Sequence, residues 1–238
     1  IVNLLSISQG ETITAVVPVK NFEDDKYLVM VTKSGVIKKT DMSSFANIRK
    51  AGLTAVNLRE GDELIAAFLT DGTKDIFAAT RNGMGIRFNE NDVRPMGRTA
   101  TGVKAITLTG DDYVVSSDII EENDKLLNVT ENGYGKRTEE SAFNVQYRGG
   151  KGVKIHQITE KTGLLSGVIK VSDNEELMIV TSEGVIIRLR GKEISTFGRI
   201  SQGVKLINLG EGVSVAGIAK IDEEDIMEEE SQKTETEE

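Results

Sequence analysis

The stretch Thr130-Glu-Asn-Gly-Tyr-Gly-Lys-Arg-Thr138 decides the fold, because related copies of it recur along the chain. Each copy places a glycine three residues after a threonine, and an apolar run precedes each threonine. The other copies span residues 32–40, 80–88 and 181–189, so the first threonines lie 48, 50 and 51 positions apart. An apolar run, a glycine turn and a second β-prone run are typical of a β-hairpin. A hairpin at a nearly constant spacing predicts a repeat fold.

Further predicted strands lie between successive hairpins. A glycine opens the first of them, at 53–58, 103–108, 153–158 and 204–209. A glycine turn leads to the second, at 64–69, 114–120, 164–171 and 213–221, and the apolar run 13–19 precedes the first hairpin. Each full repeat thus supplies about four strands, with short helical turns expected at 40–45 and 138–143. Four-stranded sheets that are apolar on both faces and repeat radially predict an all-β, propeller-like disc.

The net acidity of the chain is concentrated at its C-terminal end. Segment 222–238 contains ten acids and one base, so it carries 1 − 10 = −9, which equals the formal charge of the whole chain. Residues 1–221 are therefore neutral overall, and we expect one β domain there, followed by a disordered acidic tail at 222–238. Residues 1–5 match 55–58, which indicates that the chain begins inside a repeat and that the first blade is largely missing.

The residue types that most catalytic and metal sites need are scarce. The chain has no cysteine and a single histidine, His156, which we interpret as a structural residue on a strand. One histidine without cysteine makes neither a catalytic triad nor a typical transition-metal site. The glycine-rich segment 149–152 lacks the strand–loop–helix context of a phosphate-binding loop. We expect neither catalysis nor a cofactor in this chain, and the lack of cysteine and of long apolar runs fits a cytoplasmic protein.

Basic residues recur at fixed places in the repeat. One follows each hairpin glycine by four residues, an arginine precedes most strand-opening glycines by four, and a lysine follows most of those glycines by two. In a radial fold such positions lie at one height, so they predict a basic belt for the phosphate backbone of duplex DNA. Few aromatic residues (5%) argue against a stacking platform for single strands. The predicted DNA contacts are Lys38, Lys39, Arg49, Lys50, Arg87, Arg98, Lys104, Lys136, Arg137, Arg148, Lys151, Lys154, Arg188, Arg199 and Lys205.

Four stretches carry a family resemblance: Ile1-Val-Asn-Leu-Leu5, Gly133-Tyr-Gly-Lys-Arg-Thr138, Gly102-Val103 and Gly203-Val204. Together they resemble the C-terminal domain of the A-type subunit of DNA gyrase, over residues 1–221. The resemblance implies a β-pinwheel whose blades exchange strands, and a role in wrapping duplex DNA around a basic rim. It also implies two partners, the B-type subunit of gyrase together with the rest of the A-type subunit, in an A2B2 bacterial enzyme that introduces negative supercoils. That enzyme would act at the nucleoid in the cytoplasm, with ATP and magnesium used in its other parts.

One loop resembles a motif of that family, the gyrase box Gln-Arg-Arg-Gly-Gly-Arg/Lys-Gly. The loop consists of Gln146, Tyr147, Arg148, Gly149, Gly150, Lys151 and Gly152, with Tyr147 in place of an arginine. In the family the box lies in the first blade, upstream of where this chain begins. We therefore interpret the loop as a box-like copy in an equivalent inter-blade position, where glycine allows close approach to phosphate. The alternative is an ordinary glycine turn.

Two other interpretations remain open. The A-type subunit of topoisomerase IV has a similar but degenerate pinwheel, whereas the run of repeats is intact here. A protein-interaction propeller of the WD or kelch kind is the alternative from another class of function. The chain has no tryptophan and therefore no Trp-Asp pair, which argues against the WD kind. A DNA-shift assay separates the DNA-binding and protein-binding classes.

Overall fold

The computed structural model describes residues 12–20, 22, 25–48 and 52–221. Within them the chain is all-β and contains no α-helix, as predicted. The strands are β1 (Tyr27–Thr32), β2 (Val36–Asp41), β3 (Leu64–Thr70), β4 (Asp75–Thr80), β5 (Met84–Asn89), β6 (Val103–Lys104), β7 (Val114–Ile120), β8 (Lys125–Thr130), β9 (Tyr134–Glu139), β10 (Val153–Lys154), β11 (Leu165–Lys170), β12 (Glu176–Thr181), β13 (Ile186–Arg190), β14 (Val204–Lys205) and β15 (Val215–Ile221). Four short 3₁₀-helices follow the hairpins: η1 (Met42–Phe45), η2 (Glu90–Asp92), η3 (Glu140–Ala142) and η4 (Gly191–Glu193).

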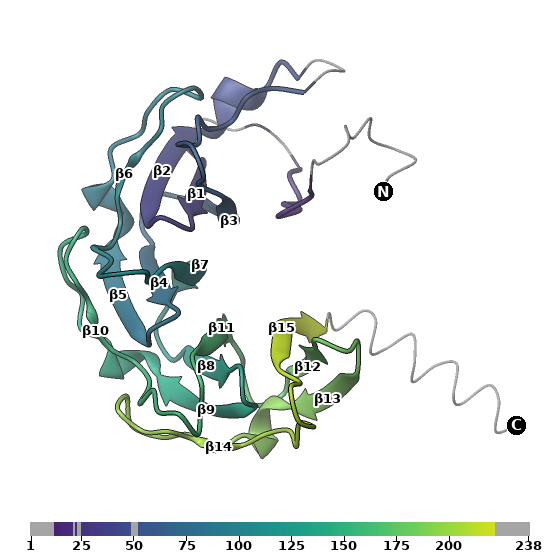
Figure 1. Cartoon of the computed structure of the whole chain (residues 1–238). Coiled ribbons are helices and arrows are strands. Elements are labelled where there is room, and N and C mark those ends of the chain that lie inside the picture. Colours follow the sequence, from purple (N-terminus) through teal and green to yellow (C-terminus); the bar gives the residue numbers. More distant parts are fainter. Residues whose placement is uncertain (1–11, 21, 23–24, 49–51, 222–238) are drawn as a thin grey trace, which may run out of the picture. The chain divides into compact units, whose positions relative to one another are not determined.

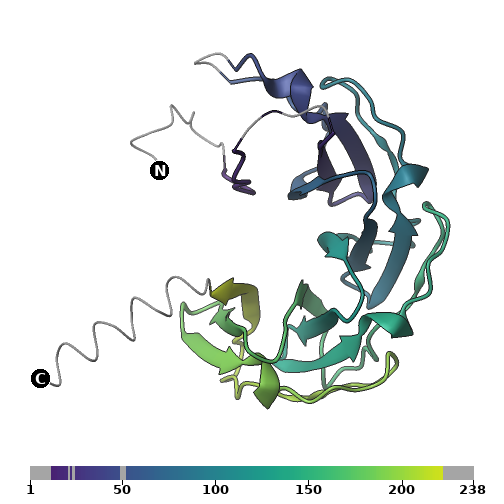
Figure 2. The same ribbon diagram turned by 180° about the vertical axis from the view of Figure 1, so that it is seen from behind.

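In the described residues, each of the first three hairpins is completed by two strands from later repeats and the fourth by one. The strand orders of the sheets are β3-β1-β2-β6, β10-β5-β4-β7, β11-β8-β9-β14 and β13-β12-β15. Figure 1 shows β1 and β2 flanked by β3 and β6, which belong to the next two repeats, and Figure 2 shows the same strands from behind. A repeat such as β6 to β9 supplies four strands but distributes them over three sheets. The predicted exchange of strands between blades is therefore confirmed.

The recurring threonine and glycine close the hairpin turns. In the third hairpin Gly133 has φ 78°, and its N–H donates to the carbonyl of Thr130 at 3.0 Å. The Thr130 hydroxyl accepts a second bond from the N–H of Tyr134 at 3.2 Å. Positive φ strains any residue with a Cβ, so glycine is the natural residue at this place. The same threonine bond recurs in the other hairpins at 3.1–3.3 Å, from Val36, Met84 and Val185.

The strand-opening glycines are needed because two backbones meet there. Gly152 and Gly203 have φ 70° and 71°, and a Cβ on either would overlap the carbonyl oxygen of Gly85 or Gly135 on the neighbouring hairpin. The strands that they open, β10 and β14, are only two residues long. Beyond them the chain bends to the hairpin turn, where the N–H of Leu206 donates to the carbonyl of Gly133 at 2.8 Å.

The predicted strands 103–108, 153–158 and 204–209 were therefore too long. Residues 53–58 and 13–19 form no strand. In the other repeats, these strands pair with a hairpin that lies earlier in the chain. For residues 13–19 and 53–58 that hairpin would lie before residue 12, and no such hairpin is among the described residues. Gly52 agrees with this explanation, since a Cβ there would meet nothing within 4 Å.

Contacts divide the chain into two compact units. Unit 1 comprises Ile1–Ala78, Gly85–Ile120 and Val145–Val153, and unit 2 comprises Ala79–Met84, Glu121–Asn144 and Lys154–Glu238. Each unit has its own apolar core, which contains Val29, Ile37, Ile76 and Phe88 in unit 1 and Leu127, Leu177 and Ile179 in unit 2. Strands that are apolar on both faces are thus covered on both sides. The expected acidic tail at 222–238 and the first copy of the repeat at 1–5 lie outside the described residues.

Candidate nucleic-acid interface

The structure separates the predicted DNA contacts by burial and by partner. Arg49 and Lys50 lie outside the described residues. Lys39 is only 2% exposed, and its Nζ lies 3.0 Å from the carbonyl oxygen and 3.4 Å from Oε2 of buried Glu90. Arg137 is 5% exposed and pairs with Asp173, while its Nε donates to the carbonyl of Ile194 at 2.8 Å. The expectation that these two side chains face DNA is corrected, because both side chains are buried and each is paired with a carboxylate.

Two other hairpin arginines are paired with carboxylates on the partner strand. Arg87 Nε lies 2.9 Å from Asp75 Oδ2. Arg188 and Arg190 both pair with Glu176, and the hydrogen bonds from Arg190 and then Arg188 hold the pKa of that carboxyl below its usual range. A phosphate would have to compete with these carboxylates for the same donors. The base four residues after each hairpin glycine is therefore chiefly a structural ion-pair position.

Lys38 and Lys136 are more deeply buried still, and they do not face solvent. Their side chains are 1% and 0% exposed. Lys136 Nζ donates to the carbonyls of Gly198 and Arg199 at 2.7 and 2.6 Å, and Lys38 Nζ donates to those of Ala55 and Arg98. We therefore correct the expectation that these two lysines contact DNA themselves.

The loop arginines, Arg98, Arg148 and Arg199, occupy one place in successive repeats and are half-buried. Each donates from Nη1 to a backbone carbonyl two residues after the strand-opening glycine of the preceding repeat. The acceptors are the carbonyls of Thr54 at 3.5 Å, Lys104 at 3.1 Å and Lys154 at 2.7 Å. A guanidinium has five N–H donors, so these bonds orient the group and leave donors for a phosphate.

The strand lysines, Lys104, Lys154 and Lys205, are the exposed members of the predicted set. They end β6, β10 and β14, where alternation turns their side chains outward while the next residue, such as Ala105 or Ile155, is buried. Within the described residues none of the three has a carboxylate oxygen within 4 Å. They are therefore unneutralised cations at a repeating register.

The box-like loop 146–152 packs closely against the segment behind Gly102. Gly149 N–H donates to the carbonyl of Ala105 at 2.6 Å, and Arg148 Nε donates to the carbonyl of Asp92 at 2.7 Å. Lys151 is exposed, and Tyr147 is 71% exposed with the Arg148 guanidinium 5.9 Å from its ring centroid. The loop thus offers a lysine, a tyrosine and part of an arginine on a fixed backbone.

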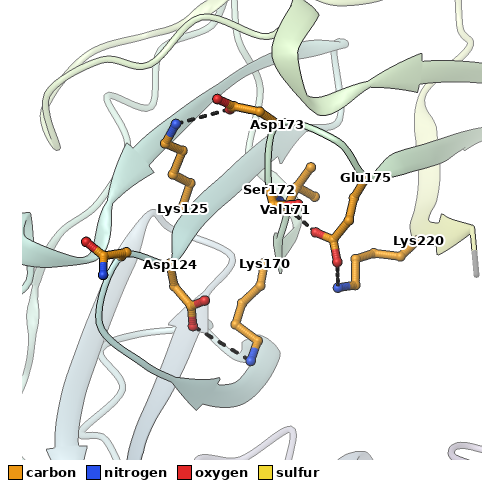
Figure 3. A pocket seen from close by; sticks show the side chains of 9 residues that line it. Asp124, Lys125, Lys170, Val171, Ser172, Asp173, Glu175 and Lys220 are labelled. Carbon is orange, nitrogen blue, oxygen red and sulfur yellow. Dashed lines mark hydrogen bonds and ion pairs between the residues drawn. The ribbon is translucent and has the colours of Figure 1, made fainter. Parts of the chain in front are cut away.

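A pocket of about 410 Å³ in unit 2 gives a useful contrast, because its lysines were not among the predicted contacts. Figure 3 shows each of them directed at a carboxylate. The pairs are Lys125 with Asp173 at 3.1 Å, Lys170 with Asp124 at 3.7 Å and Lys220 with Glu175 at 2.6 Å. These cations are neutralised in place, so the pocket is not a strong anion site.

The described residues contain no cluster of three or more histidine or acidic side chains that could hold a metal ion. Over the same residues, no helix combines the length and the apolar character that a membrane crossing requires. What repeats through the fold is positive charge at the strand lysines and loop arginines.

A family described as "DNA gyrase C-terminal domain, beta-propeller" matches residues 26–71, 74–121, 124–172 and 175–222. Each match covers one hairpin and the strand of the next repeat that pairs with it. The chain belongs to this family. It is 64% identical over 225 residues to the DNA gyrase A-type subunit of Halalkalibacterium halodurans and 48% identical to that of Clostridium acetobutylicum. In both comparisons the match covers 94% of this chain and 27% of the relative, so the chain spans about a quarter of their length.

Solved structures support the same pinwheel fold. A C-terminal domain of DNA topoisomerase IV matches with a TM-score of 0.88 and 28% identity, covering 99% of this chain and 74% of that one. A DNA gyrase A C-terminal domain matches with a TM-score of 0.81 and 27% identity, covering 92% of this chain and 74% of that one. The family assignment and the sheet topology therefore agree.

Proposed function

We propose that residues 1–221 act as a non-catalytic domain that binds and wraps duplex DNA. The observation that carries the proposal is the series of strand lysines, which are exposed and have no carboxylate neighbour in the described part of the chain. Each neutralised DNA phosphate releases counterions, so a repeated register of such cations favours a long backbone contact. The loop arginines add oriented donors beside two of these lysines, since Arg148 and Arg199 bond to the backbone of Lys104 and Lys154.

The proposed contact reads the DNA backbone rather than the bases. Lysine is a point charge that follows phosphate without base specificity. Lys151 and the box-like loop would extend the contact, with Tyr147 resting against the sugar–phosphate edge. The predicted contacts that are buried or paired with acids would act indirectly, through stability of the hairpins.

The family and the named relatives support a place in a larger enzyme. We propose that the chain works with the remainder of the gyrase A-type subunit, and with the B-type subunit, in an A2B2 assembly at the bacterial nucleoid in the cytoplasm. In that assembly this domain would need no cofactor of its own, and ATP and magnesium would act in other parts. Its contribution would be to bend DNA so that strand passage introduces negative supercoils.

Charge reversal tests the DNA interface. Lys104, Lys154 and Lys205 are changed together to glutamate, and binding to a linear duplex is measured over a range of salt. The slope of log affinity against log salt should become shallower by about 0.9 for each lost phosphate contact. The control changes Lys20, Arg59 and Lys192 to glutamate, which shifts the net charge equally at exposed positions outside the series.

Equal losses in the two triple variants would reject the strand lysines as the interface. No DNA binding by the wild-type chain would favour the protein-interaction alternative instead. The topoisomerase IV alternative is separated in the parent subunit, since a gyrase domain should be needed for negative supercoiling of relaxed plasmid.

A further inference from the structure

One position, buried in the first three hairpins and half-buried in the fourth, alternates between lysine and isoleucine. It is the third residue after the hairpin glycine, and it is occupied in order by Lys38, Ile86, Lys136 and Ile187. The isoleucines show that the strand accepts an apolar side chain at this place. A buried ammonium costs free energy unless hydrogen bonds compensate it. The two lysines therefore call for a reason beyond packing.

Each buried lysine binds the backbone of an arginine loop. Lys136 Nζ donates to the carbonyl of Arg199 at 2.6 Å and to that of Gly198 at 2.7 Å. Lys38 Nζ donates to the carbonyl of Arg98 in the same way. In both hairpins the acceptor thus belongs to the loop arginine itself, so the lysine fixes the point from which the arginine side chain projects.

The guanidinium of each arginine is held by a second contact, a hydrogen bond to the backbone of the preceding repeat. Arg199 Nη1 donates to the carbonyl of Lys154 at 2.7 Å, and Arg98 Nη1 lies 3.5 Å from that of Thr54. We propose that Lys38 and Lys136 are positioning residues that fix Arg98 and Arg199 so that their free N–H groups meet DNA phosphate. This inference rests on the proposed DNA-binding function and extends it to residues that DNA does not touch.

The remaining arginine loop, which contains Arg148, shows why its hairpin needs no lysine. Its hairpin has Ile86 in place of a lysine, and the Ile86 side chain would be 3.7 Å from a Cβ on Gly150. The Arg148 backbone is fixed instead by other bonds: Arg148 N–H donates to Asp92 Oδ2 at 3.4 Å, and Gly149 N–H donates to the carbonyl of Ala105 at 2.6 Å. The Arg148 side chain is held as well, because its Nε donates to the carbonyl of Asp92 at 2.7 Å. The box-like loop is therefore held without a lysine, whereas the other two loops depend on one.

The charge of the two lysines agrees with this arrangement. Burial, followed by repulsion from Arg98, lowers the pKa of Lys38 to about 8, and burial followed by Arg199 does the same for Lys136. Both ammonium groups remain mostly protonated at neutral pH, since a pKa of about 8 lies above 7. Each lysine thus adds positive charge directly behind the arginine that it holds.

A double-mutant cycle on the whole chain tests the proposal. Lys136→Ile, which copies the residue of two other hairpins, is combined with Arg199→Ala, and binding to linear duplex is measured at 50 and 200 mM salt. The affinity at 50 mM divided by the affinity at 200 mM salt is the quantity compared between variants. Loss of one phosphate contact lowers the salt slope by about 0.9, so over this fourfold change in salt the ratio should fall by about 3.5-fold. We expect each single variant to show this loss and the double variant to lose no more than Arg199→Ala alone. Lys170→Met, which removes a cation bound to Asp124, should leave the ratio unchanged.

Additive losses in the cycle, or unchanged binding in Lys136→Ile beside a loss in Arg199→Ala, would overturn the positioning role. If Arg199→Ala leaves the salt response unchanged while the strand-lysine variant is still impaired, the loop arginines do not contact phosphate and the positioning role is wrong. The proposed DNA-binding function would still stand in that case. Lys136→Gln keeps an amide donor for one carbonyl and should restore part of the loss. If Lys136→Ile fails to fold, Lys136→Gln and the matching cycle of Lys38→Ile with Arg98→Ala decide the question.

Discussion

His156 is expected to make the domain sensitive to mild acid. Its side chain is 1% exposed, and neither ring nitrogen has a hydrogen-bond partner in the described part of the chain. Burial, followed by the nearby charge of Lys136, lowers the pKa of His156 from 6.5 to about 4. The backbone of Gln202 acts weakly in the opposite direction, although its geometry falls short of a hydrogen bond. The perturbation is His156→Ile, which copies Ile106 and Ile207 at the same place in neighbouring repeats.

The magnitude follows from the linkage between protonation and folding. Below pH 6.5 the unfolded chain takes up a proton at His156, while the folded chain does so only near pH 4, so stability is lost as the pH falls. One pKa unit corresponds to about 1.4 kcal/mol. The histidine should therefore cost the wild type about 2 kcal/mol at pH 5 and about 3 kcal/mol at pH 4, relative to pH 7.

Urea unfolding at pH 7, 6 and 5 measures this effect in both proteins. Carboxylates also titrate over this range, but they do so in both chains, so the difference between the two free energies isolates His156. That difference should grow by about 2 kcal/mol between pH 7 and pH 5 in favour of His156→Ile. Parallel stability curves would refute the reasoning. Because the chain has one histidine, its NMR signal should independently remain that of a neutral ring at pH 5.

Three further expectations concern the turns, the box-like loop and the tail. Gly203→Ala should lower the free energy of unfolding by about 3 kcal/mol or more, because a Cβ overlaps the opposite strand, whereas Gly52→Ala should cost only about 1 kcal/mol from its positive φ. Thermal or urea unfolding compares the two, and equal costs would contradict the close approach. Changing Tyr147 and Lys151 together to alanine should reduce DNA bending, measured by energy transfer between DNA ends, with the melting temperature within a few degrees of wild type. An unchanged bend would indicate that the loop is an ordinary glycine turn without a role in DNA bending. Deleting 222–238 should tighten DNA binding at low salt, with a gain that shrinks as salt rises, because a tethered −9 segment competes with phosphate for the same cations. Identical affinities of the full and truncated chains at low salt would show that segment 222–238 does not compete with DNA for these cations.

The hairpins could be predicted from the sequence because their causes are local. A threonine, a glycine that needs positive φ and two flanking β-prone runs lie within ten residues, so spacing alone reveals them. The long second strands were also predictable from their apolar runs. The two-residue strands β6, β10 and β14 were overestimated, because the point at which the chain leaves the neighbouring hairpin is set by that hairpin and not by local residues.

The sequence alone determined a repeating all-β fold and the periodic placement of basic residues, since both depend on spacing along the chain. Only the tertiary structure decided which of those bases remain available to DNA. Lys39 and Arg137 are neutralised by carboxylates 51 and 36 residues away, Glu90 and Asp173, and Lys136 is satisfied by a loop that follows it by more than sixty residues. Such partners meet only because each hairpin is completed by strands and loops from later repeats. Charge periodicity therefore locates the cations, and the exchange of strands between blades determines which of them the protein neutralises and which it leaves exposed.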